Sequence, residues 1–211
     1  QFFDHEYDWS GRGVIVFSGA EAGFWRTYSL AVPVASGVTV ARKPYIWPLA
    51  ALVDAYGNYV VVQIDRQEVR LLLFEMGELR TSDGYEGEEV RKLKKGRGSS
   101  GGPGRRGGAP ISSRREEEIA QRNIRDAVKM AERFCRRHKP QRIIIAGAEP
   151  TATQYREALP RHLQDKVIGS FGADMNALEP EIRTQSLEIL HQVEKEREAA
   201  VVEAVFTAAA K

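Results

Sequence analysis

The sequence has only one cysteine, Cys135, among its 211 residues. A single thiol excludes a disulfide within the chain and a zinc site built from several cysteines. Scarcity of cysteine is also typical of a reducing compartment, so we expect a cytoplasmic protein. Cys135 falls on the apolar face of a predicted helix, which indicates a core residue and not a reactive thiol.

Histidine is also scarce, and the glycine that follows a predicted strand does not open a nucleotide-binding motif. The four histidines (His5, His138, His162 and His191) show no spacing typical of metal ligands. Gly147 follows a predicted strand but is not part of a Walker or GxGxxG pattern. Asp174 and Glu179 are better explained as a turn and a helix start than as an acid–base pair. We therefore expect neither a metal nor a cofactor.

Long apolar runs are missing as well. No run approaches the roughly 20 residues that cross a bilayer, and no signal peptide is visible, so we expect no membrane partner. The composition is otherwise that of an ordinary globular chain, with 42% hydrophobic and 28% charged residues and a net charge of +2. The chain starts at Gln1 and ends in a helical run from Glu198 to Lys211, so we expect both ends to continue in a longer protein.

Acidic residues are absent from one basic, glycine-rich stretch, residues 94–115, which we call the arm. Its cations are Lys94, Lys95, Arg97, Arg105, Arg106, Arg114 and Arg115. Such side chains can neutralise RNA phosphates, and successive glycine amides can approach and bind an anion. A silent flexible linker is the alternative. The single sign of charge, and the position of the arm inside one predicted domain, favour RNA binding.

The first part of the chain, residues 1–56, predicts part of a small α/β domain. Strands are expected over residues 13–18, 24–30 and 32–40, followed by a helix over residues 48–56 that Gly57 ends. The block also carries five aromatic residues. We interpret these as core and edge packing, with stacking on bases as the alternative: Phe24, Trp25, Tyr28, Tyr45 and Trp47.

The second part, residues 57–211, predicts a central α/β domain with a mixed sheet in layers. A hairpin over residues 59–64 and 69–75 and a third strand from Glu78 precede the flexible Gly/Arg-rich loop, residues 94–112. Ser113 and Glu116 fit a capping box that opens a long helix over residues 113–138. Strands and helices then alternate: 142–146, 151–159, 166–170 and 179–198.

Several segments in this order resemble one known family. They are GVIVFSG (13–19), PLAALVDAYGNYVVVQID (48–65), RREEEIAQRNIRDAVKMAERF (114–134), RIIIAGAEP (142–150) and HLQDKVIG (162–169). Together with the arm they resemble the archaeal/eukaryotic-type class-1 peptide chain release factors, and look closest to the bacterial relatives of that family. The resemblance implies a protein that binds the ribosome, its rRNA and peptidyl-tRNA, with no DNA partner, and hydrolyses the peptidyl-tRNA ester.

The resemblance also assigns a catalytic triplet in the arm. Gly107 and Gly108 are the counterparts of the family's glycine pair, and Ala109 stands where the family has glutamine. Three hypotheses follow. The loop hydrolyses the ester through its backbone amides; or the chain is a non-catalytic, pelota-like ribosome rescue or quality-control factor; or it is an α/β scaffold whose basic loop binds RNA non-specifically.

Overall fold

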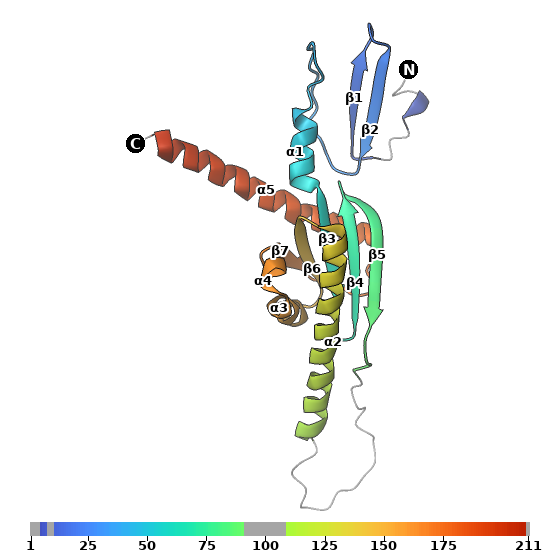
Figure 1. The fold of residues 1–211 in the computed structure, drawn as a ribbon, viewed down its shortest axis with the longest axis vertical. Coiled ribbons are helices and arrows are strands. Elements are labelled where there is room, and N and C mark those ends of the chain that lie inside the picture. Colours follow the sequence, from blue (N-terminus) through green and yellow to red (C-terminus); the bar gives the residue numbers. More distant parts are fainter. Residues whose placement is uncertain (1–4, 8–10, 91–108, 210–211) are drawn as a thin grey trace, which may run out of the picture.

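The fold is built on a five-stranded mixed sheet with helices on both faces (Figure 1). The computed structural model describes residues 5–7, 11–90 and 109–209, except for the side chains of residues 109–113. The strands are β3 (Asn58–Ile64), β4 (Glu68–Glu75), β5 (Glu78–Glu86), β6 (Arg142–Ala146) and β7 (Val167–Phe171). They lie in the order β5-β4-β3-β6-β7, which confirms the predicted α/β class and mixed sheet.

The sheet changes from antiparallel to parallel at β3. The β3–β4 hairpin is antiparallel, and its turn is held by the Asp65 side chain, which accepts bonds from the amides of Gln67 and Glu68 at 2.7 and 2.6 Å. β3 with β6, and β6 with β7, pair in parallel. The apolar run of β6 is buried on both faces, as expected for a central strand.

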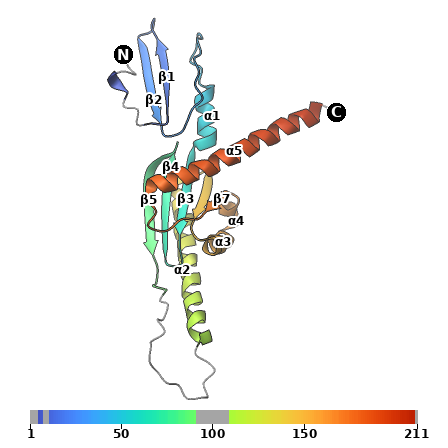
Figure 2. The same ribbon diagram turned by 180° about the vertical axis from the view of Figure 1, so that it is seen from behind.

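Each face of the sheet has its own apolar core. Alternate strand residues such as Val60 and Val62 pack under α2 (Ala109–His138) and α3 (Glu149–Ala158). The other residues, such as Tyr59 and Val61, pack under α5 (Glu179–Ala209) and α1 (Trp47–Tyr56), which Figure 2 shows from behind. A short helix, α4 (Arg161–Gln164), precedes β7. Alternation along the strands therefore places helices on both faces.

The predicted core position of Cys135 is confirmed. Its side chain is 6% exposed inside the α2-side core, and burial raises the pKa of the thiol to about 11. A thiol with a raised pKa and little access to solvent is a packing group and not a nucleophile.

The N-terminal region forms a separate two-stranded hairpin. β1 (Gly13–Gly19) pairs antiparallel with β2 (Phe24–Leu30), as predicted for both strands. It lies at the opposite end of the molecule from the start of α2 (Figure 1). Leu30 and Val32 join the α5-side core. The proposed boundary between residues 1–56 and 57–211 stays a prediction.

Three expectations of the sequence were wrong. Residues 32–40, all of which the structure describes, form no strand, because Pro33 removes a ladder donor and no neighbouring strand pairs with them. Val38 and Val40 are 95% exposed. The five aromatic side chains predicted as packing are all exposed: Phe24 43%, Trp25 47%, Tyr28 46%, Tyr45 50% and Trp47 67%.

The third error concerns the start of the long helix. α2 begins at Ala109, four residues before the predicted Ser113, so residues 109–112 of the predicted loop are helical. Pro110 explains the earlier start, because proline suits the first turn, where its missing amide hydrogen would have no acceptor. Ser113 lies inside the helix, so it cannot form the predicted capping box with Glu116.

Candidate functional site

The last residues of the arm, 109–115, form the start of α2, which projects from the body of the protein. No side chain described between Arg114 and Ile119 is buried, and the first buried residue of α2 is Ala120. Figure 1 shows this end of α2 extending past the ends of the strands. At 1.5 Å per residue, roughly 15 Å of helix stands clear of the sheet. The projection presents the residues that follow the arm far from the two cores.

Most of the predicted site residues lie outside the described part of the chain. They are Lys94, Lys95, Arg97, Arg105, Arg106, Gly107 and Gly108. Ala109 is the first residue of α2. Arg114 and Arg115 lie exposed on the projecting part of that helix, and Arg114 Nε is 3.8 Å from Glu118 Oε1. Two predicted cations, Arg114 and Arg115, are therefore exposed to solvent near the start of α2.

The start of α2 also offers backbone hydrogen-bond donors. The amide groups of the first helical turn have no acceptor within the helix, and the helix macrodipole makes this end positive. Ala109 is part of that turn, while Pro110 has no amide hydrogen to give. The arrangement can therefore bind an anion or a developing negative charge beside Gly108.

Asn123 fixes the segment that follows β5 to α2. It is 5% exposed. Its Nδ2 donates to the carbonyls of Glu88 (2.9 Å) and Arg66 (3.1 Å), and its Oδ1 accepts from the Glu88 amide (3.1 Å). Gly87 packs so closely against the Asn123 side chain that a Cβ atom there would collide with it. The chain therefore leaves β5 along a defined path.

Two ion pairs add to this attachment. Arg66 Nη2 lies 2.8 Å from Glu117 Oε2, and Arg122 Nη1 lies 3.2 Å from Glu88 Oε2. Both pairs are exposed, so each contributes little to stability. Both nevertheless join α2 to segments that precede the arm.

Sequence reasoning missed Asn123, although a signal was present. The residue interrupts an apolar helix face otherwise formed by Ala120, Ile124 and Ala127, at the spacing of that face. A polar side chain at such a position must find hydrogen bonds when buried. Its partners, however, are 35 and 57 residues away in sequence.

The described residues offer neither a metal-ligand cluster nor a membrane-spanning helix. Within residues 5–7, 11–90 and 109–209, no three His, Cys, Asp or Glu side chains gather as ligands of one ion. In the same part of the chain, none of the helices combines the length and apolar character that crossing a bilayer requires.

Comparison with solved structures finds matches of low sequence identity. The archaeal translation termination factor aRF1 is 14% identical, with 93% of this chain and 55% of that chain covered and a TM-score of 0.46. Pelota of Archaeoglobus fulgidus is 10% identical, with 77% and 43% covered and a TM-score of 0.43. This chain thus spans about half the length of those proteins. No curated protein matches it.

A family model assigns the family. The model described as "Bacterial archaeo-eukaryotic release factor family 10" matches residues 44–198. The match includes α1, the whole five-stranded sheet, the arm and the first two thirds of α5. It therefore covers most of the chain and most residues of both cores. This chain belongs to the bacterial archaeo-eukaryotic release factor family 10.

Proposed function

We propose that this chain acts at the ribosome and hydrolyses the ester of peptidyl-tRNA with its arm. One observation carries the proposal: in a chain of the release factor family, the triplet Gly107–Gly108–Ala109 ends at the free start of a projecting helix. A projecting helix suits a protein whose reactive group must reach into a narrow site. The cations of the arm, which include Arg114 and Arg115, suit contact with rRNA and tRNA phosphates.

The chemistry requires little from side chains. A water molecule attacks the ester carbonyl carbon, the bond from that carbon to the ribose oxygen of the tRNA breaks, and the products are the peptide acid and a ribose hydroxyl. Negative charge builds on the carbonyl oxygen during the attack. Amides around Gly108 and Ala109 would donate hydrogen bonds to that oxygen, and glycine leaves room for the ester to approach.

A second function is favoured by Ala109, which replaces the glutamine of the family pattern. If that glutamine is needed to position water, the chain is a non-catalytic ribosome-binding rescue or quality-control factor, similar to pelota. Its arm would then occupy the site without cleaving the ester. The two functions share ribosome binding and differ in peptide release.

Release of labelled peptide from ribosomes that carry peptidyl-tRNA tests the proposal. We expect the protein to release peptide and Gly108→Ala to lower the rate by roughly 100-fold, the typical cost of disturbing one oxyanion donor. Gly37→Ala is the matched control, because a Cβ at that glycine meets no atom within 4 Å. Ala109→Gln is expected to retain or raise the rate.

The other outcomes separate the alternatives. Co-sedimentation with ribosomes, without release by the protein or by Ala109→Gln, would support the non-catalytic function. Absence of both release and ribosome binding would overturn both functions.

A further inference from the structure

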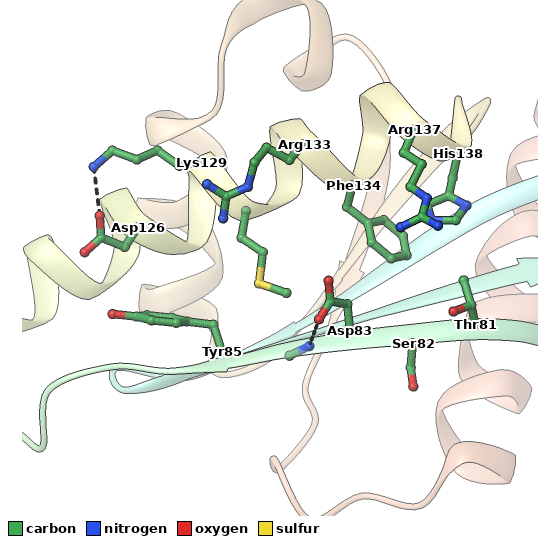
Figure 3. Close-up of a pocket in the computed structure, with 12 residues that line it drawn as sticks. Thr81, Ser82, Asp83, Tyr85, Asp126, Lys129, Arg133, Phe134, Arg137 and His138 are labelled. Carbon is green, nitrogen blue, oxygen red and sulfur yellow. Dashed lines mark hydrogen bonds and ion pairs between the residues drawn. The ribbon is translucent and has the colours of Figure 1, made fainter.

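A groove on the far half of α2 has no role in the function proposed above. It lies between α2 and the edge strand β5, has a volume of about 640 Å³ and opens to solvent. Figure 3 shows β5 below it and the C-terminal part of α2 above it. The groove lies roughly 30 Å along the helix from Ala109, so it is separate from the arm.

The wall of the groove is a row of cations. Lys129, Arg133 and Arg137 recur every four residues, so they share one side of α2 at a spacing of about 6 Å. Lys129 Nζ is 2.8 Å from Asp126 Oδ1. No ion pair to another described residue occupies Arg133 or Arg137, and both lie over the groove in Figure 3. A regular row of this kind suits the repeated phosphates of one nucleic acid strand.

The floor of the groove is polar and aromatic. Thr81, Asp83 and Tyr85 pair with Leu73, Leu71 and Val69 of β4, whose side chains are buried beneath α2. Paired residues share a face of the sheet, so all three floor residues point towards the helix side. Because α2 does not cover β5, this part of the face stays open, and Tyr85 is 39% exposed.

We propose that the groove binds single-stranded RNA. The cations would neutralise the phosphates, Tyr85 offers a ring on which a base can stack, and the Asp83 carboxylate can accept bonds from base amino groups. An acidic peptide could use the cations too, but its carboxylate side chains can neither stack on Tyr85 nor donate hydrogen bonds to Asp83. The groove would add an RNA contact that does not depend on the chemistry of the arm. That the RNA belongs to the ribosome rests on the proposed function.

Binding of a short fluorescent single-stranded RNA to the full chain tests the groove. Replacing Lys129, Arg133 and Arg137 together by glutamine is expected to weaken binding at least about ten-fold and to lower the slope of log Kd against log salt by roughly 2. The matched control replaces Arg125, Arg136 and Arg156, three exposed arginines outside the groove, by glutamine. It removes equal charge and is expected to stay near the wild-type affinity.

A second pair of variants tests stacking. Tyr85→Ala is expected to weaken RNA binding by roughly ten-fold, whereas Tyr85→Phe keeps the ring and the affinity. Thermal unfolding of each variant verifies that it is folded. Equal losses in the groove and control triple variants, or equal affinities of the two Tyr85 variants, would overturn the proposal. So would polyglutamate that binds the groove more tightly than RNA.

The ribosome assay and the RNA assay can fail separately. A protein that binds RNA through the groove, but neither binds ribosomes nor releases peptide, would overturn the proposed function and leave the groove intact. A protein that releases peptide, but whose groove variants bind RNA like the wild type, would support the proposed function and overturn the groove as an RNA site.

Discussion

Asn123 joins α2 to two segments that precede the arm in the chain. Its amide group satisfies two carbonyls and one amide hydrogen of segments that come together only in the folded chain. A shorter side chain would leave those backbone groups without partners in a partly buried place. Such unsatisfied groups are costlier than the bonds themselves are favourable.

We therefore expect Asn123→Ala to lower the free energy of unfolding by about 2–3 kcal/mol. Urea titration measures this, and hydrogen exchange is expected to show faster exchange of the Glu88 amide. Gln121→Ala, at an exposed position of the same helix, is the control and should change stability by less than about 0.5 kcal/mol. Equal stabilities of the two variants would contradict the role given to Asn123.

At the scale of elements, α2 has a projecting N-terminal part and a packed C-terminal part. Its C-terminal part buries Ile124, Ala127, Val128, Ala131 and Phe134 against the sheet, while its first turns bury nothing that the structure describes. The packed part sets the direction of the projecting part, because the two belong to one continuous helix. The same helix thus presents the end of the arm at one end and the groove cations near the other.

The parallel part of the sheet depends on close contact at Gly147, directly after β6. A Cβ atom at this position would collide with the backbone carbonyl oxygen of Ile64 at the end of β3. We expect Gly147→Ala to lower the free energy of unfolding by about 1–3 kcal/mol, because the two strand ends must move apart.

Gly172 supplies the comparison for this prediction. It follows the neighbouring strand β7, and a Cβ there meets no atom within 4 Å. Gly172→Ala is therefore expected to stay within about 0.5 kcal/mol of the wild type in the same denaturation experiment. Similar stabilities for the two alanine variants would contradict the strand-end contact.

At the scale of the whole molecule, burial of ionisable groups makes the fold sensitive to alkali. Tyr59 is 1% exposed on the α5 face, its hydroxyl lies 3.2 Å from Ser186 Oγ, and burial raises its pKa to about 12. Burial raises the pKa of Tyr155 and of Cys135 in the other core as well. Both cores therefore hold groups that favour their neutral form.

The raised pKa of Tyr59 determines how the free energy of unfolding changes with pH. The unfolded chain loses this proton near pH 10 and the folded chain only near pH 12, so the folded state holds more protons between these values and stability falls as pH rises. We expect the free energy of unfolding of the wild type to fall by roughly 2 kcal/mol more than that of Tyr59→Phe between pH 9 and 12. Below pH 9 the two profiles are expected to run parallel. Parallel profiles up to pH 12 would contradict the prediction.

Local patterns in the sequence determined most of the elements. Alternating or continuous apolar residues give a strand wherever they occur, so residues 59–64, 69–75 and 142–146 could be recognised without their partners. The periodic face of α2 likewise predicted that Cys135 is buried. The arm's composition and the order of the segments indicated the family, which the family model confirms. These signals lie within short windows of the chain.

Tertiary structure decided what depends on distant residues. The aromatic residues of β2, together with Tyr45 and Trp47, are exposed because no layer of the described chain covers them, and residue type alone does not predict this exposure. Asn123 meets Arg66 and Glu88, and the cations of α2 face β5 about 50 residues earlier in the chain, only because the sheet order places β4 and β5 beside that helix. Helices and strands follow from nearby residues. The contacts of Asn123, and the groove between α2 and β5, arise from the packing of one element on another.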